Sequence, residues 1–209
     1  MNRRNVRVAV LVLAVAALVG AAGGCASTNM RSQISPDFPG EPYEKVLVWV
    51  DLDDAMLVQS AEDYLVDELD AIGVDAVAQY TVFFDEKEYS FEERKRALNE
   101  RDIDAVMTLV LTDAGATRHR IPPSRYTVSR VNPYTGRVHH STRWTRGGVD
   151  VDAWADFKAE LLDRESGEIV WRALAKTSGD PSVGRVGFLQ SVSREIAGSL
   201  KKDGIVATN

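Results

Sequence analysis

The first 25 residues most constrain the interpretation of this chain. Their pattern is typical of a segment that directs export and is not part of a folded domain. Arg3, Arg4 and Arg7 make its start positive, and an uncharged apolar run covers residues 8–22 before the chain reaches Cys25. A basic start, an apolar centre and a small-residue end are typical of an export signal. The apolar run of 15 residues is shorter than the roughly 20 that cross a bilayer, so a cleaved signal is favoured over a permanent transmembrane helix.

The small residues before Cys25 resemble the lipobox of bacterial lipoproteins. Residues 21–25 are Ala-Ala-Gly-Gly-Cys, with Ala22 where leucine is more usual. The resemblance implies cleavage after residue 24 and acylation of Cys25 on its sulfur and its new amino group. Cys25 is the only cysteine, so it has no partner for an internal disulfide, and two acyl chains anchor a protein stably. The alternative is ordinary cleavage nearby, which leaves Cys25 as a free thiol.

The charge of the remaining chain is negative and unevenly distributed. Without residues 1–24 the chain has about 185 residues, with 22 basic and 31 acidic side chains, which is enough for one domain with a sizeable core. The net acidity argues against nucleic acid as a general partner.

Residues 114–149 contain no Asp or Glu and carry a charge of +7, which leaves about −16 on the rest. All three histidines, His119, His139 and His140, also lie in this segment. The seven arginines are Arg118, Arg120, Arg125, Arg130, Arg137, Arg143 and Arg146.

Hydrophobic periodicity predicts an α+β domain over residues 45–204. Residues 25–44, rich in Ser, Pro and Gly, are predicted to be the lipidated cysteine and a flexible tether, and residues 205–209 a tail. The expected order is a strand at 45–50, a helix to 72, a strand at 74–78, a helix from Ser90 to about 101, and a strand at 104–112. This order favours a mixed, partly parallel β-sheet with helices packed on it.

The second half of the domain is expected to be antiparallel. Alternating apolar residues predict a long hairpin, with strands at 149–162 and 168–177 around a turn that contains Gly167. An amphipathic C-terminal helix then runs from Val186 to a stop at Gly204. Between these parts, residues 126–131 and 137–145 flank a turn-like sequence at 132–136. This basic insertion at 114–149 is expected to be either a protruding hairpin or a disordered loop.

Three motifs carry a resemblance to known periplasmic domains. They are Lys45-Val-Leu-Val-Trp-Val50, Asp102-Ile-Asp-Ala-Val-Met-Thr-Leu-Val110, and Leu161-Leu-Asp-Arg-Glu-Ser-Gly-Glu-Ile-Val-Trp171. Their order resembles lipoprotein domains of the curli-secretion CsgG type, the amino-terminal domain of TolB and the activator lipoproteins of penicillin-binding proteins. The resemblance implies binding to envelope partners and, because Ala26 follows the cysteine, anchoring at the outer membrane facing the periplasm. It does not imply a pore, because the segments around 132–136 lack the alternation of membrane-crossing strands.

The acids Asp51, Asp53, Asp54 and Asp113 follow predicted strands, where carboxylates can hold a divalent metal. The simpler interpretation is that Asp54 caps the first helix and the others solvate loops. The adjacent His139 and His140 point to opposite faces of a strand and do not suit one ion, and no acid lies near them in sequence. No metal, cofactor or catalytic site is therefore expected.

The arginines, interleaved with Tyr126, Tyr134 and Trp144, suit recognition of phosphates or carboxylates. The alternative is a solvated loop, or one that lies on the acidic part of its own domain. The sequence therefore predicts a non-enzymatic, membrane-anchored module that binds an envelope protein or an anionic glycan or lipid. Alternatives are a subunit of an oligomeric secretion or envelope complex and, less favoured, a metal-dependent enzyme that uses the four acids.

Overall fold

The computed structural model describes residues 26–83, 89–131 and 138–207. The export signal and Cys25, the turn at 132–136, and Tyr134 and Arg137 lie outside the described residues. The strands are β1 (Ser27–Ile34), β2 (Lys45–Asp51), β3 (Asp75–Ala78), β4 (Ala105–Ile121), β5 (Arg125–Val131), β6 (Val138–Trp144), β7 (Gly148–Asp163) and β8 (Ile169–Gly179). The helices are α2 (Ala55–Ala71), α3 (Gln79–Val82), α4 (Phe91–Asn99) and α5 (Gly184–Asp203), with a 3₁₀ turn at Pro181–Val183.

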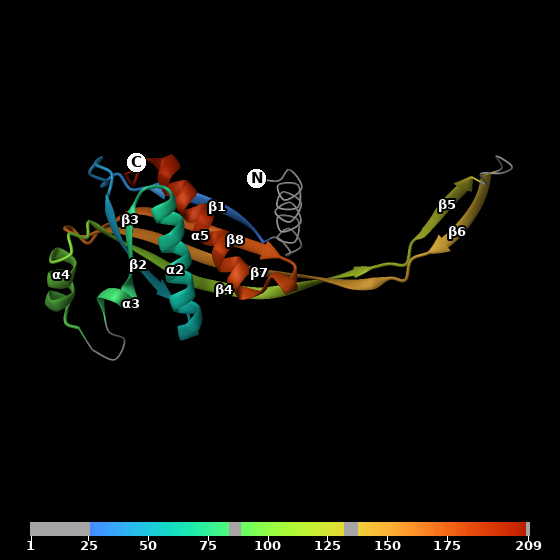
Figure 1. Ribbon diagram of the computed structural model, residues 1–209, viewed down its shortest axis with the longest axis horizontal. Coiled ribbons are helices and arrows are strands. Elements are labelled where there is room, and N and C mark those ends of the chain that lie inside the picture. The colour runs from blue at the N-terminus through green and yellow to red at the C-terminus, as the bar shows by residue number, and fades with distance from the viewer. Residues whose placement is uncertain (1–25, 84–88, 132–137, 208–209) are drawn as a thin grey trace, which may run out of the picture.

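Six strands form one mixed sheet in the order β1-β8-β7-β4-β2-β3 (Figure 1). β2 runs parallel to both β3 and β4, whereas β4, β7, β8 and β1 pair antiparallel in turn. The parallel part comes from the crossover through α2, and the antiparallel part from the β7–β8 hairpin. The expected α+β fold with a mixed sheet and helices packed on it is confirmed.

Helices α2 and α5 lie side by side over one face of the sheet and bury the main core (Figure 1). Leu65 and Leu69 of α2 and Ile196 and Leu200 of α5 are fully buried, as is Trp171 of β8. The Trp171 indole Nε1–H donates a 2.8 Å hydrogen bond to Asp203 Oδ2 at the end of α5. In the predicted C-terminal helix, Leu189, Val192, Ile196 and Leu200 are buried in this core, whereas Val186 at its start is exposed.

The turn between β7 and β8 forms as its sequence predicts. Asp163 Oδ2 accepts hydrogen bonds from the backbone N–H of Ser166 at 2.7 Å and from its hydroxyl at 2.8 Å. Gly167 has φ of +73°, a conformation that side chains disfavour. The Asp and Gly of the motif thus serve the turn, and Trp171 serves the core.

The predicted helix ends are also present. Asp54 caps α2 by accepting from Met56 N–H at 3.1 Å. Ser90 and Glu93 form the expected capping box at the start of α4. Gly204 ends α5 in the left-handed region, with φ of +69°. These short-range signals succeed because each involves residues within one turn of the chain.

The flexible tether predicted for residues 25–44 is wrong for its first half. Ser27–Ile34 form strand β1, which pairs with β8 along its whole length, from Ser27 opposite Ser178 to Ile34 opposite Trp171. The Thr28 hydroxyl lies 2.7 Å from that of Thr177 and 2.8 Å from that of Ser191 on α5. The sequence around β1 is polar because this strand covers the sheet edge, where only one side is buried.

The predicted tail also belongs partly to the domain. Ile205 and Val206 are buried in the core, and Val206 forms a parallel bridge to Tyr43. Tyr43 N–H donates to Ile205 O, and Ala207 N–H donates to Tyr43 O. The folded domain therefore begins at about residue 26 and extends to at least residue 207.

One carboxylate on the face of the sheet opposite α2 and α5 is held between two cations. Glu160 of β7 is 9% exposed. Its Oε1 accepts from Arg172 Nε at 2.6 Å, and its Oε2 lies 3.0 Å from Lys158 Nζ. Burial alone would raise the pKa of Glu160, but the hydrogen bonds and charges of Lys158 and Arg172 outweigh it and hold that pKa below its ordinary value.

This arrangement predicts an acid-dependent contribution to stability. Because the pKa of Glu160 is lowered in the folded state, its contribution is fully present above the ordinary value near 4.5 and is lost as the pH falls through the folded value. Replacing Glu160 by Gln should lower the free energy of unfolding at pH 7 and make it less dependent on pH between about 5 and 3. Urea unfolding of both proteins at several pH values measures this, and equal slopes would contradict it.

Strand β1 predicts that a shortened chain is unstable. A protein that begins at residue 35 should lose roughly 2 kcal/mol or more of unfolding free energy compared with one that begins at residue 26, because the β1–β8 pairing and the burial of Met30 are removed. For a domain of this size that corresponds to about 5 °C or more in Tm. Thermal unfolding followed by circular dichroism measures the difference. Equal Tm values would restore the tether interpretation.

Candidate functional site

The basic insertion is an ordered two-stranded structure that projects from the sheet. β8 ends where Gly179 pairs with Ala153. Beyond that point β4 and β7 continue alone, with residues 117–121 paired to residues 148–152. β5 and β6 then pair with each other as a separate two-stranded sheet. We call residues 116–131 and 138–153 the arm, and Figure 1 shows it extending away from the helices and the sheet.

A bend joins the two halves of the arm. Thr145 N–H donates to Ser124 O at 2.8 Å, and Ser124 N–H donates to Thr145 Oγ1 at 2.9 Å, so the two chains stay connected through the bend. Gly147 lies where the backbone of the facing chain is close. A Cβ on Gly147 would lie 2.6 Å from the Ile121 carbonyl oxygen, which is closer than van der Waals contact permits. Glycine is therefore required at this position.

The first half of the arm separates charge between its faces. Paired residues of an antiparallel ladder share a face, so Arg118 lies with Val151, and Arg120 lies with Val149. The other face carries His119 with Asp150 and Asp152, and His119 Nε2 lies 3.5 Å from Asp152 Oδ2. Strand β7 thus brings an acidic residue from outside residues 114–149 to the side of His119, which the order of residues in the sequence did not indicate.

The second half of the arm exposes arginine and aromatic side chains. On one face, Tyr126 pairs with Arg143, and Arg130 lies four residues further along β5. On the other face Arg125 pairs with Trp144, whose side chain is 69% exposed. His140 accepts or donates a 2.8 Å hydrogen bond at Nδ1 to the Ser129 hydroxyl. His139 is in register with Arg130 instead.

The described arginines of the arm have no carboxylate partner within the described part of the chain. They are Arg118, Arg120, Arg125, Arg130, Arg143 and Arg146, and none of them takes part in an ion pair with a described residue. The alternative that this segment lies on the acidic part of its own domain does not hold, because the arm extends away from it (Figure 1). The prediction that these arginines bind a ligand remains a prediction.

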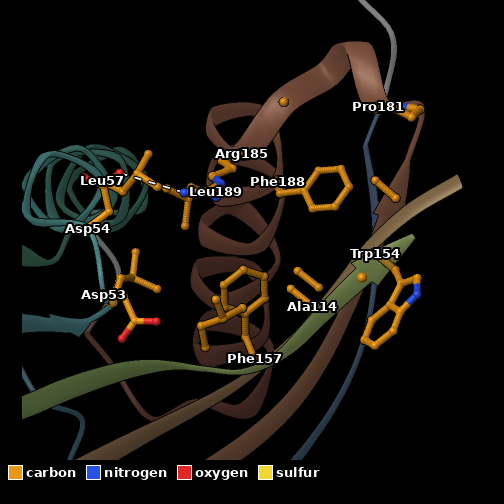
Figure 2. A pocket seen from close by; sticks show the side chains of 16 residues that line it. Asp53, Asp54, Leu57, Ala114, Trp154, Phe157, Pro181, Arg185, Phe188 and Leu189 are labelled. Atoms are coloured by element: carbon orange, nitrogen blue, oxygen red, sulfur yellow. Dashed lines mark ion pairs between the residues drawn. The ribbon is translucent and has the colours of Figure 1, made fainter. Parts of the chain in front are cut away.

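A separate apolar cavity of about 430 Å³ lies between α2, α5 and the start of the arm. Its side chains include Leu57 of α2, Phe157 of β7, and Phe188 and Leu189 of α5, which Figure 2 shows around one space. Trp154 lies at its edge with its ring pointing away from the cavity (Figure 2), under the Lys176 ammonium group and so near Gly115 that a Cβ there would be 2.8 Å from the ring. Sequence reasoning missed this cavity, although Trp154 interrupts the alternation of small apolar residues along β7.

The four acids that could suggest a metal site have other roles or lie apart. Asp54 caps α2, and its Oδ2 lies 3.8 Å from Arg185 Nη1 at the cavity rim (Figure 2). Asp51 pairs with Val110, three residues before Asp113 on the neighbouring strand. Asp113 accepts from the N–H of Ala114. Within residues 26–83, 89–131 and 138–207, no group of three or more His, Cys, Asp or Glu side chains is placed to hold a metal ion.

Among the residues that the structure describes, no helix has both the length and the apolar character needed to cross a membrane.

Comparisons with known proteins give matches to solved structures only. No family model matches the chain, and no curated protein matches it. It is similar to the PelC dodecamer from Paraburkholderia phytofirmans, at 14% identity with a TM-score of 0.48, over 87% of this chain and 99% of that one. It is also similar to lipoprotein GNA1162 from Neisseria meningitidis, at 14% identity with a TM-score of 0.42, over 76% of this chain and 98% of that one. These values are too low for an argument about function, so the family resemblance remains a prediction.

The role of Asp54 leads to a test that separates a cap from a metal ligand. Replacing Asp54 by Ala should lower the free energy of unfolding by about 1 kcal/mol, because Met56 N–H loses its acceptor. Asp53→Ala should change it little. Millimolar Mg²⁺ or Mn²⁺ should leave Tm unchanged in the wild type and both variants. A metal-induced rise in the wild-type Tm that Asp53→Ala abolishes would instead support the metal-dependent enzyme.

Proposed function

We propose that this protein is a lipid-anchored, non-enzymatic binding module of the bacterial cell envelope that contacts its partner through the arm. The export signal and the lipobox-like sequence support attachment by acyl chains on Cys25. Ala26 after the cysteine supports the outer membrane, with the domain facing the periplasm.

The observation that carries the proposal is the arm itself. It holds arginines that form no ion pair with a described residue, together with exposed Tyr126 and Trp144. Guanidinium groups bind phosphates and carboxylates with paired hydrogen bonds, and exposed Trp, Tyr and Arg are the residues that dominate binding interfaces. An arm that projects from a rigid sheet presents these groups to a partner without a change in the domain.

A second candidate is a subunit of an oligomeric envelope complex. The part of the chain outside residues 114–149 is strongly acidic, and the arm does not reach it within one molecule (Figure 1). In an assembly, the arm of one copy would meet the acidic surface of the next. Such contacts repeat head to tail, and they close into a ring when the rotation between copies permits.

The test compares two variants with the same change of charge. The arm variant carries Arg118→Gln, Arg120→Gln, Arg130→Gln and Arg143→Gln. The control variant carries Lys95→Gln, Arg101→Gln, Lys201→Gln and Lys202→Gln, which lie on α4, after α4 and at the end of α5. Both variants keep a polar side chain at each position and lose four positive charges.

In cells, chemical crosslinking followed by mass spectrometry should recover envelope partners with the wild type and the control variant. The arm variant should recover them at least tenfold less, because charge-assisted contacts are lost. Recovery of a second copy of this chain would favour the oligomeric candidate, and the mass after gentle detergent extraction would measure it. An identical crosslinking pattern for all three proteins would remove the arm from the proposal.

A further inference from the structure

The position of β1 determines which end of the domain faces the membrane. Ser27 pairs with Ser178, Ser178 pairs with Trp154, and Trp154 pairs with Gly115. These four residues form one row across the sheet. At about 4.8 Å between neighbouring strands, the row spans about 15 Å from Ser27 to Gly115.

The arm leaves the sheet next to this row. The ribbon of β4 and β7 stands alone beyond the Ala153–Gly179 pair, one position past Trp154. The chain before Ser27 is held to the domain as well, because the Ala26 carbonyl accepts from the Ser191 hydroxyl at 3.4 Å. The start of the folded chain and the base of the arm are therefore neighbours.

The covalent distance to the anchor is short. Cys25 precedes Ser27 by two residues, so their Cα atoms are at most about 8 Å apart. A flexible tether of twenty residues would let the domain stand off the bilayer in any orientation. With β1 folded, an acylated Cys25 brings the end of the sheet that carries the arm against the headgroups.

The composition of the arm suits this position. Arginine, Trp and Tyr side chains gather in the interfacial layer of bilayers, where cations meet anionic headgroups and aromatic rings reach the acyl boundary. Trp144 is 69% exposed and Val149 65% exposed, beside the arginines of both halves of the arm. The acidic remainder of the domain is repelled by the same anionic surface. This repulsion favours an orientation in which the arm faces the membrane.

The arm cannot enter the hydrocarbon. It has two strands whose outer edges leave backbone groups unpaired, and such edges are not tolerated among acyl chains. Arginine side chains near the bilayer centre also carry a high free-energy cost. A ribbon that is tied to the surface at its base and excluded from the interior can contact the bilayer only along the headgroup layer.

We propose that the arm lies on the membrane that holds the anchor, with its arginines bound to the phosphates of anionic phospholipids. This membrane inference rests on one part of the proposed function, the acylation of Cys25. It names the bilayer surface, rather than an envelope protein, as the arm's partner.

The first experiment uses the acylated mature protein in vesicles. Cys25 is consumed by the thioether, so Thr142→Cys places one environment-sensitive fluorophore on β6, where the side chain is exposed. Glu100→Cys places it after α4 as the control. In vesicles with one third phosphatidylglycerol, the label at 142 should shift its emission to the blue and be quenched by bromolipids, whereas the label at 100 should do neither.

Phosphatidylcholine vesicles, or 0.5 M salt, should reverse at least half of the shift, because the contact is electrostatic and screened within a Debye length. The arm variant with four Arg→Gln changes should lose the shift as well. A label at 142 that responds alike to anionic and neutral vesicles, or not at all, would overturn the proposal.

A second experiment measures affinity without the anchor. The mature chain with Cys25→Ser should co-sediment with phosphatidylglycerol vesicles, and the control variant should do the same. Each arginine near an anionic surface contributes about fivefold, so the arm variant should bind at least 100-fold more weakly. Equal binding of the arm and control variants would also overturn the proposal.

The two proposals fail separately. If the vesicle experiments are negative but the arm variant loses its crosslinked envelope protein, the partner is a protein, and only the membrane inference falls. If acyl labelling shows no lipid on Cys25, the proposed lipid anchor is wrong, and so is the membrane inference that rests on it. If vesicle binding depends on the arm and no protein crosslink does, the bilayer is the arm's partner.

Discussion

The antiparallel pairing of β4 with β7 is the interaction on which the rest of the structure depends. It begins inside the core, where Ala105 faces Asp163, and continues to Ile121 opposite Gly148 at the bend. Its inner part holds Met107, Leu109 and Phe157 under the two helices. Its outer part leaves the sheet and becomes the arm. The same ladder therefore anchors a rigid core at one end and presents charged side chains at the other.

A bulge in this ladder decides which side chains the arm presents on each face. The register shifts between Leu111 and Asp113, and the Thr112 hydroxyl donates to Asp156 O at 2.9 Å beside the shift. Before the bulge, Leu109 and Leu111 share the face of Ala159 and Phe157. After it, Ala114 shares the face of Ala155, and Arg118 and Arg120 continue that face. One extra residue in a strand exchanges its two faces, so the bulge places arginine, rather than His119, on the side of the helices.

Local signals in the sequence predicted much of the fold. The cap at Asp54, the box at Ser90 and Glu93, and the turn at Gly167 each depend on neighbours along the chain, so their geometry follows from residue type. The apolar rows of α2, α5, β7 and β8 identified the core because burial is periodic in both helices and strands. β1 was missed because it has no apolar row: an edge strand with polar residues at most positions resembles a linker until its partner, β8, is known.

The sequence alone predicted the export signal, and it determined the charge separation between residues 114–149 and the rest and the α+β class, because these depend on composition and short-range order. Tertiary structure alone decided that the folded domain begins at about residue 26, that Asp152 reaches His119, and that the described arginines of the arm form no ion pair with a described residue. Each of these requires strands distant in the chain to pair in one register, and a pairing register is set by the packing of the whole sheet. The position of the arm relative to the start of the folded chain depends on that packing, since the same arginines after a long tether would have no fixed position relative to residue 26.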